Sequence, residues 1–221
     1  MSDHYPAKPS APFPMEGGCP CGLIRYRMES APLIVHCCHC TSCQRETGTA
    51  FALNAVIESE LVTSLPPAAP VVPGSPASSY AQEAGPTVTH WVPDAETARI
   101  SEAKGNIIEP RIFLAPSASK QGQQIARCPR CAAAVWSFYA GGGPFRKFVR
   151  VGTLDEAWKV GPDVHIFTES RRDFVHLADG VPQYSMFYPK AKDVWRKESL
   201  ERWEKVLPQV MEYRKRGDLI E

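Results

Sequence analysis

The sequence predicts a mainly β protein with a C-terminal helix and a long proline-rich insertion. Short apolar runs recur between turn residues, which is typical of strands. The 21 prolines among 221 residues favour turns and extended segments over long helices. Apolar residues recur at helical spacing only after Lys192. Together these three observations favour a domain built of short strands and followed by one helix.

The first 16 residues contain four prolines, at positions 6, 9, 12 and 14, which leave no room for a helix or a central strand. We therefore predict a flexible tail over residues 1–16. A tight turn follows at Gly17–Gly22, where glycines allow a positive φ. Leu23–Met28 then alternates between apolar residues and arginines, which predicts a half-buried strand.

Further strands are predicted where apolar or β-branched runs end at turn residues. These runs are residues 33–35, 51–57, 135–139, 148–151 and 165–168. Between them, residues 64–124 carry seven prolines before Asp94, and we predict an insertion there. Two short strands, Thr87–Val92 and Arg111–Leu114, are expected to return from it to the sheet.

Residues 191–221 form the predicted C-terminal helical extension. Leu200, Trp203, Leu207 and Met211 share one helical face, with charged residues between them. Pro208 should kink or split the helix. We expect this helix to pack on the domain, and Trp195 with Trp203 to be candidates for a homodimer contact.

Seven of the eight cysteines fall into two groups within residues 17–190. Cys19-Pro-Cys21 and Cys128-Pro-Arg-Cys131 form a group of four, and Cys38, Cys40 and Cys43 form a group of three. Four thiolates complete a tetrahedral zinc site, whereas three leave one position open for water or substrate. We therefore predict two zinc ions per chain, one structural and one catalytic, in a zinc-binding β-domain. An unligated or disulfide-bonded set is the alternative for the group of four.

The open site has two alternatives of its own. Cys37, His36 or His39 could supply a fourth ligand and close it, or the central cysteines could pair with one of the flanking motifs. The side chains of adjacent cysteines diverge, so we expect Cys37 to be a small buried hydrophobe instead. Zinc held by three thiolates is a weak Lewis acid, which favours a soft sulfur ligand such as glutathione over direct activation of water.

The net charge and the lack of long apolar runs limit which partners and which cellular location we expect. With 25 Lys and Arg against 24 Asp and Glu, we expect no nucleic-acid partner. No apolar run is long enough to cross a membrane, and the first residues lack the apolar core of a secretory signal. Clustered cysteines without export indicate metal ligation in a reducing compartment, so a cytoplasmic location is expected.

The cysteine motifs also carry a resemblance. Gly18-Cys-Pro-Cys-Gly, Cys38-His-Cys-Thr-Ser-Cys-Gln-Arg and Cys128-Pro-Arg-Cys, in this order, resemble the glutathione-dependent formaldehyde-activating enzyme family, also called centromere protein V-like. Gly152–Asp155 and His165–Thr168 resemble its downstream strands. Ala132 and Phe174 depart from it, standing where the family usually has Gly and Trp.

The resemblance implies a β-tent fold of antiparallel sheets around zinc and a carbon–sulfur lyase. Cys19, Cys21, Cys128 and Cys131 would hold the structural zinc, and Cys38, Cys40 and Cys43 the catalytic one. Glutathione would be the co-substrate, adding to formaldehyde to give S-hydroxymethylglutathione. The long insertion leaves two rivals open: a lyase for a bulkier thiol or glutathione adduct in biosynthesis, and a non-catalytic zinc-binding module.

Other candidates lie outside the cysteines. Arg45, just past the open site, is a candidate to hold a glutathione carboxylate, with an exposed arginine on a turn as the plain interpretation. His165 and His176 are candidates for a general acid or base, with a satisfied core histidine as the plain interpretation. Five further side chains are candidates for anion binding, with a solvated face as the alternative: Arg146, Lys147, Arg150, Arg171 and Arg172.

Overall fold

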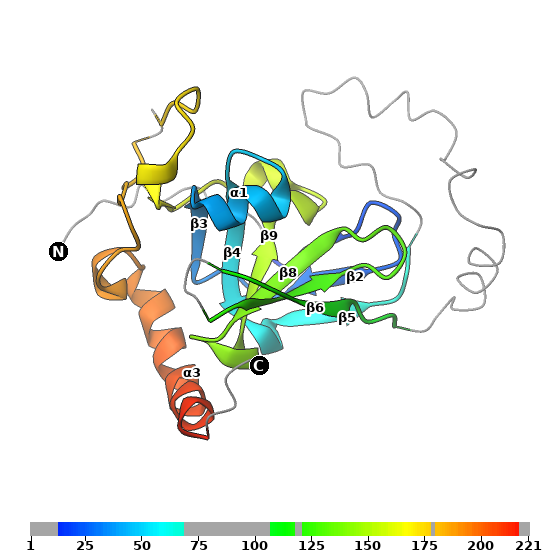
Figure 1. The fold of residues 1–221 in the computed structure, drawn as a ribbon. Helices are drawn as coiled ribbons and strands as arrows, with labels where there is room; N and C mark the ends of the chain where they lie inside the picture. Colours follow the sequence, from blue (N-terminus) through cyan, green and yellow to red (C-terminus); the bar gives the residue numbers. More distant parts are fainter. Residues whose placement is uncertain (1–12, 69–106, 118–120, 178–179, 217–221) are drawn as a thin grey trace.

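The computed structural model describes residues 13–68, 107–117, 121–177 and 180–216. Within them, two sheets and two α-helices make up the fold, which confirms the mainly β prediction (Figure 1). The strands are β1 (Met15–Gly18), β2 (Arg25–Met28), β3 (Ile34–Cys38), β4 (Ala52–Glu58), β5 (Val62–Leu65), β6 (Arg111–Ala115), β7 (Gln123–Arg127), β8 (Ala134–Tyr139), β9 (Arg146–Arg150) and β10 (Val164–Ile166). The helices are α1 (Thr41–Thr47) and α3 (Lys197–Lys215).

The small sheet has the order β1-β2-β5, and the large one has the order β10-β3-β4-β9-β8-β7-β6. Neighbouring strands are antiparallel except β10 and β3, which are parallel. The prediction of antiparallel sheets is therefore confirmed apart from this one pair. The parallel pair aligns His165 with Cys37, so β10 brings distant residues beside the central cysteine motif.

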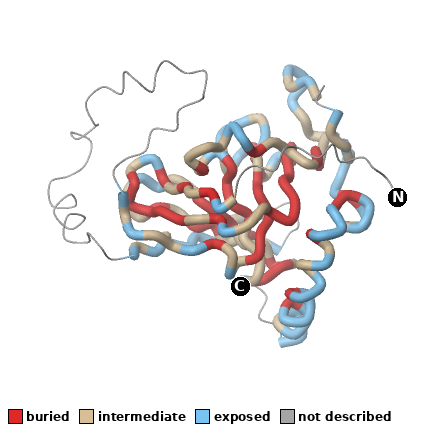
Figure 2. The backbone as a smooth tube through the Cα atoms, turned by 180° about the vertical axis from the view of Figure 1, so that it is seen from behind, coloured by how far each residue is buried: buried red, intermediate tan, exposed pale blue. Residues whose placement is uncertain are grey.

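The two faces of the large sheet bury different sets of side chains, because successive residues of a strand point to opposite faces. One face packs Val35, Ala55 and Val149 against the small sheet, around Tyr26 and Met28. The opposite face carries Cys38, Val56 and Phe148, together with the segment that leads into α3. Figure 2 shows the buried residues concentrated in these strands, while much of α3 is exposed. The cysteine group of three thus belongs to the second face.

The C-terminal helix is confirmed, but its packed face differs from the prediction. Val206 and Val210 are buried, whereas Leu207 and Met211 are 38 % and 46 % exposed. The helix also continues through Pro208, so the predicted split is wrong. A proline at an exposed position removes one backbone hydrogen bond, and the anchors on either side hold the helix together.

One anchor of α3 is a buried ion pair. Arg202 donates to both carboxylate oxygens of Glu58 at 2.9 and 2.6 Å, and to the carbonyl of Ala31. Trp195 is buried and contacts Trp203 edge-on at 6.2 Å between ring centroids. Both tryptophans therefore pack within the chain, and the homodimer contact stays a prediction.

Several predicted boundaries need correction. The segment predicted as a tail over residues 1–16 contains the start of β1, in which Met15 pairs with Met28. Residues 1–12 and the predicted strand over residues 87–92 lie outside the described residues. The insertion predicted over residues 64–124 overlaps strands at both ends, since β5 ends at Leu65 and β7 begins at Gln123. β6 confirms the strand predicted at Arg111. The division into three parts and the β-tent arrangement stay predictions.

Candidate zinc and thiol-binding site

The structure brings together the four cysteines predicted to form the closed site. Their sulfur atoms all lie within 4.8 Å of one another. Cys19 and Cys21 are 3.4 Å apart, and Cys21 and Cys128 are 3.7 Å apart. Tetrahedral zinc with bonds of about 2.3 Å would separate its sulfur ligands by about 3.8 Å. The donor set and its spacing therefore fit one zinc ion.

Two similar turns present these cysteines. Backbone N–H groups point at the sulfurs, from Ile24 to Cys19 at 3.2 Å and from Arg130 to Cys128 at 3.4 Å. Gly22, which follows the first pair, has φ 76°, and Ala132, which follows the second, has φ 59°. Ala132 thus occupies a left-handed conformation that favours glycine, at the position where it departs from the family pattern.

The group of three lies at the junction of β3 and α1. Cys38 is the last residue of β3, Cys40 is the N-cap of α1, and Cys43 lies in its first turn. Their sulfurs also lie within 4.8 Å of one another, and all three are buried. Hydrogen bonding from Cys38 lowers the pKa of Cys40, so this group favours a shared thiolate. The donor spacing fits one zinc ion as well.

The sequence analysis missed helix α1 and placed Arg45 on a turn. The helix forms because Cys40 caps its start through the Cys43 N–H at 3.4 Å, and because Gly48, at φ 67°, ends it. Buried Gln44 donates to the carbonyls of His39 and Ser170 at 2.7 and 2.8 Å. These contacts fix the helix against the segment that follows β10.

An ion-pair network holds the other side of α1. Glu46 accepts from Arg127 at 2.7 Å and from Arg150 at 2.6 Å, and the side chains of Glu46 and Arg150 are only 9 % exposed. Arg150 also donates to Asn54 and Ser137. Arg150 is therefore committed to the framework behind the cysteines, which makes it a positioning group and not the anion-binding candidate predicted from sequence.

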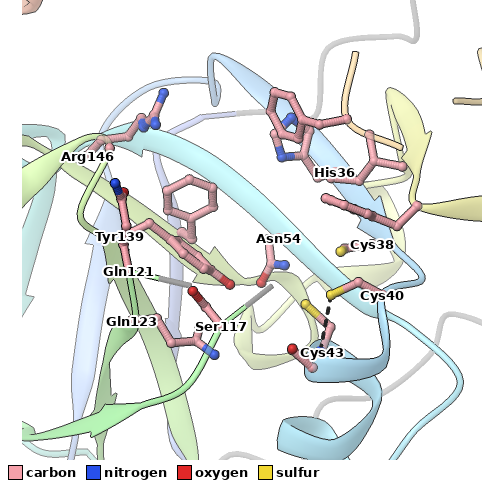
Figure 3. Close-up of a pocket in the computed structure, with 16 residues that line it drawn as sticks. His36, Cys38, Cys40, Cys43, Asn54, Ser117, Gln121, Gln123, Tyr139 and Arg146 are labelled. Carbon is pink, nitrogen blue, oxygen red and sulfur yellow. Dashed lines mark hydrogen bonds between the residues drawn. The ribbon is translucent and has the colours of Figure 1, made fainter. Parts of the chain in front are cut away.

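The three cysteines open onto a cavity of about 220 Å³ on the same face of the large sheet (Figure 3). Strand register explains part of its lining, because His36 pairs with Asn54 across the sheet and both side chains line the cavity. Its further lining residues include Ser117, Gln121, Gln123, Tyr139, Arg146, Phe148 and Phe187. Figure 3 shows Asn54, Tyr139 and Ser117 between Arg146 and the cysteines. A ligand that reaches the sulfurs therefore contacts both polar and aromatic side chains.

Arg146 supplies a cation to this cavity. Its guanidinium lies 4.7 Å from the ring centroid of Trp203 and 5.2 Å from that of Phe148. Burial lowers the pKa of Arg146 to about 10, so it remains charged at neutral pH. Within the described part of the chain it forms no ion pair with a carboxylate, and its Nε has no hydrogen-bond partner. An anionic ligand would supply the missing partner.

His36 does not close the group of three. Its Nε2 lies 2.9 Å from the hydroxyl of Tyr188, and its ring is surrounded by Phe148, Phe187 and Tyr188. Burial lowers the pKa of His36 to about 3, so the ring is neutral. His36 therefore lines the cavity as an uncharged side chain.

Cys37 and His39 do not close the group either. They join His165 in a third cluster, whose ligand atoms lie within 4.8 Å of one another. The expectation that Cys37 is an ordinary buried hydrophobe is therefore incomplete, because its sulfur lies 3.5 Å from His39 Nε2. Sequence spacing gave no signal for this cluster, since His165 joins it only through the parallel strand pair.

The remaining predicted residues lie away from the cavity. Arg45 is exposed on α1 and does not line it. Lys147 points to the opposite face of the sheet, 4.5 Å from the ring centroid of Trp136. Arg171 donates to backbone carbonyls, and Arg172 is exposed. Arg146 is the cavity-lining member of the predicted anion-binding set. Phe174, the second departure from the family pattern, is 73 % exposed.

No helix in the described ranges is both long and apolar enough to cross a membrane.

Among solved structures, the chain is similar to the crystal structure of a Rhodobacter sphaeroides protein that was a structural-genomics target. That comparison has 14 % sequence identity and a TM-score of 0.34, and it covers 77 % of this chain and 100 % of the other. No curated protein matches the chain.

The comparison with protein families gives a more specific result. The model of the glutathione-dependent formaldehyde-activating enzyme family matches residues 14–92, the segment that includes Cys19, Cys21 and the central cysteine motif. At the level of that family, the match supports a glutathione-dependent formaldehyde-activating or related function. The match confirms the resemblance for the first two cysteine motifs, whereas the Cys128-Pro-Arg-Cys131 motif lies outside the matched residues.

Proposed function

We propose that the protein is a zinc-dependent carbon–sulfur lyase that acts on glutathione–aldehyde adducts, in the manner of an S-hydroxymethylglutathione synthase. The observation that carries the proposal is the cluster of three buried cysteines, Cys38, Cys40 and Cys43, which lines a cavity together with Arg146, a cation that forms no ion pair within the described residues. The family match over residues 14–92 supports the same class of reaction.

The cavity suits a thiol that carries a carboxylate. Its volume of about 220 Å³ is far larger than a one-carbon aldehyde needs, so a larger co-substrate fills most of it. The thiol end would face the cysteines, and a carboxylate would accept hydrogen bonds from the Arg146 guanidinium. We therefore propose that Arg146, which lines the cavity, binds the carboxylate in place of Arg45, which does not.

Bound zinc would supply a position for a sulfur ligand and lower the pKa of that thiol. The chain's own groups would position the aldehyde. Tyr139 carries a hydroxyl donor, and Asn54 an amide donor, that face the space above the cysteines (Figure 3). In the reaction the sulfur forms a bond to the carbonyl carbon and the C=O π electrons move to oxygen. The proton lost by the thiol ends on that oxygen, which a hydroxyl donor stabilises as charge develops.

The test is Cys40→Ser, assayed by NMR exchange between ¹³C-formaldehyde and its glutathione adduct. Serine is a preferred N-cap, so α1 should still begin at residue 40 while the site loses a thiolate. We expect exchange to fall to the uncatalysed rate, with the closed zinc site and the circular dichroism spectrum retained. Exchange at the wild-type rate in a folded Cys40→Ser protein would overturn the proposal and favour the non-catalytic zinc-binding module.

Arg146→Met tests the carboxylate contact separately. Loss of one charge-assisted hydrogen bond costs about 1.5–3 kcal/mol, so we expect KM for glutathione to rise about tenfold or more with a smaller change in kcat. Lys147→Met is the matched control, because Lys147 is adjacent in sequence but faces the other side of the sheet. An equal rise in KM in both variants would contradict the assignment.

A bulkier adduct is the second candidate substrate. The cavity wall formed by Phe148, Phe187 and Phe167 is aromatic, and Phe187 is 51 % exposed beside it. Such a surface favours an apolar group on the adduct. Comparison of kcat/KM for formaldehyde with that for glutathione adducts of larger aldehydes distinguishes the two substrates. We also propose that the zinc-binding domain starts with β1 at Met15 and ends near residue 190. We propose the cytoplasm as its location, because the sites need reduced thiols.

A further inference from the structure

The geometry points to a third metal site, formed by Cys37, His39 and His165 on the opposite side of β3 from the cysteine group of three. We infer that it binds a zinc-class divalent ion. The inference does not depend on the proposed lyase reaction, because it rests on residues that do not line the thiol-binding cavity.

Three separate segments build the cluster. Cys37 lies on β3, His39 on the link from β3 to α1, and His165 on β10, where the parallel register places it beside Cys37. Successive residues of β3 point to opposite faces, so Cys37 and Cys38 cannot bind one ion. The cluster is therefore distinct from the group of three.

The spacing of the ligand atoms fits a tetrahedral ion. Cys37 Sγ lies 3.5 Å from His39 Nε2, and His39 Nε2 lies 3.0 Å from His165 Nδ1. With zinc bonds of about 2.3 Å to sulfur and 2.0–2.1 Å to nitrogen, a tetrahedral site separates sulfur from nitrogen by about 3.5 Å and the two nitrogens by about 3.4 Å. A shift of a few tenths of an ångström would seat an ion.

The surroundings are also those of a metal site. All three side chains are buried, with exposures of 3, 0 and 3 %. One thiolate and two imidazoles suit zinc and copper, whereas magnesium and calcium prefer oxygen ligands.

A second cavity, of about 320 Å³, provides access. It is lined by the three candidate ligands and by Phe51, Val160 and His176, and His176 is exposed. Three protein ligands beside a cavity leave a fourth position for water, for His176 or for a small ligand. This arrangement differs from the cluster of four cysteines, where the protein supplies every ligand.

The test is ¹¹³Cd NMR on the full-length chain loaded with cadmium, because the chemical shift of cadmium depends strongly on how many sulfurs bind it. We expect three signals, two from sulfur-rich sites and one shifted toward the range of mixed nitrogen and sulfur ligands. Only two signals, both in the sulfur-rich range, would overturn the inference and leave a metal-free hydrogen-bonded cluster.

His165→Gln assigns the third signal, since His165 is far in sequence from the other proposed ligands. We expect the third signal to disappear, with cadmium falling from three to two per chain and the sulfur-rich signals unchanged. If His165→Gln does not fold, Cys37→Ala removes the sulfur ligand with the same expected result. Persistence of the mixed-ligand signal in a folded variant would contradict the assignment.

Discussion

At the scale of single residues, Ala132 is an instance of local strain beside Cys131, a proposed zinc ligand. A left-handed conformation costs a non-glycine residue about 1–2 kcal/mol. Replacing Ala132 with glycine removes this cost. The glycine also increases the conformational entropy of the unfolded chain, which destabilises the fold by about 0.4–1 kcal/mol. We expect Ala132→Gly to stabilise the fold by up to about 1 kcal/mol, which raises Tm by about 2 °C in thermal unfolding of the zinc-loaded protein.

Gly22 provides the reciprocal control, because it has the same backbone conformation in the other cysteine turn. Gly22→Ala should lower Tm by a similar amount, for the same reason with the opposite sign. A fall in Tm for both variants would show that the turn after Cys128 tolerates alanine without strain, and that the departure from the family pattern has no cost.

The sequence predicted the grouping of the cysteines better than it predicted their surroundings. The cysteine groups could be predicted because zinc sites use short, regular spacings. The cavity residues could not, since Asn54, Tyr139 and Phe148 share a face with Cys38 only through the register of four strands. The Cys37, His39 and His165 cluster was missed for a related reason, because one of its members comes from the parallel strand.

At the scale of secondary-structure elements, α1 depends on a nearly buried ion-pair network. Glu46→Gln removes the charge that Arg127 and Arg150 share, and leaves Arg150 with only neutral partners. Removing one member of a buried pair typically costs about 3–5 kcal/mol. Because the glutamine oxygen still accepts one hydrogen bond, we expect a loss of about 3 kcal/mol, or roughly 6–12 °C in Tm.

Arg45→Gln is the matched control for that prediction. Arg45 lies next to Glu46 on the same helix but is exposed, so its replacement should change stability by less than about 0.5 kcal/mol. Thermal unfolding followed by circular dichroism compares the two. Equal stability of Glu46→Gln and wild type would show that α1 is held by Gln44 and the cysteines alone.

Element boundaries were predicted least well where tertiary contacts decide them. The start of β1 lies in the segment predicted as a tail. Its pairing with β2 and the ion pairs of Glu16 with Arg25 and Arg27 place Met15 and Glu16 in the small sheet, and no local sequence pattern indicates these contacts. Strand β7 was missed because Gln123–Arg127 has little apolar periodicity, although Ile125 and Ala126 are buried. In α3 the apolar spacing predicted the helix, but Val206 and Val210 form its packed face.

At the scale of the whole molecule, the four-cysteine group connects two regions that are distant in sequence. Cys19 and Cys21 lie between β1 and β2 of the small sheet, whereas Cys128 and Cys131 lie between β7 and β8 of the large one. A zinc ion there would join the two sheets across the shared core. The group of three joins only β3 and α1, which are adjacent in the chain, so its metal would contribute less to global stability.

This difference predicts unequal effects of removing one ligand from each site. Structural zinc contributes about 10–16 kcal/mol of apparent binding free energy, which is comparable to the stability of a whole domain. Cys131→Ser should therefore lower Tm by more than about 10 °C or prevent folding, whereas Cys40→Ser should lower Tm by only a few degrees. Elemental analysis and thermal unfolding of both proteins provide the measurement. Equal losses of stability in the two variants would mean that both metals are structural. That result would contradict the proposal that the group of three has an open, reactive position.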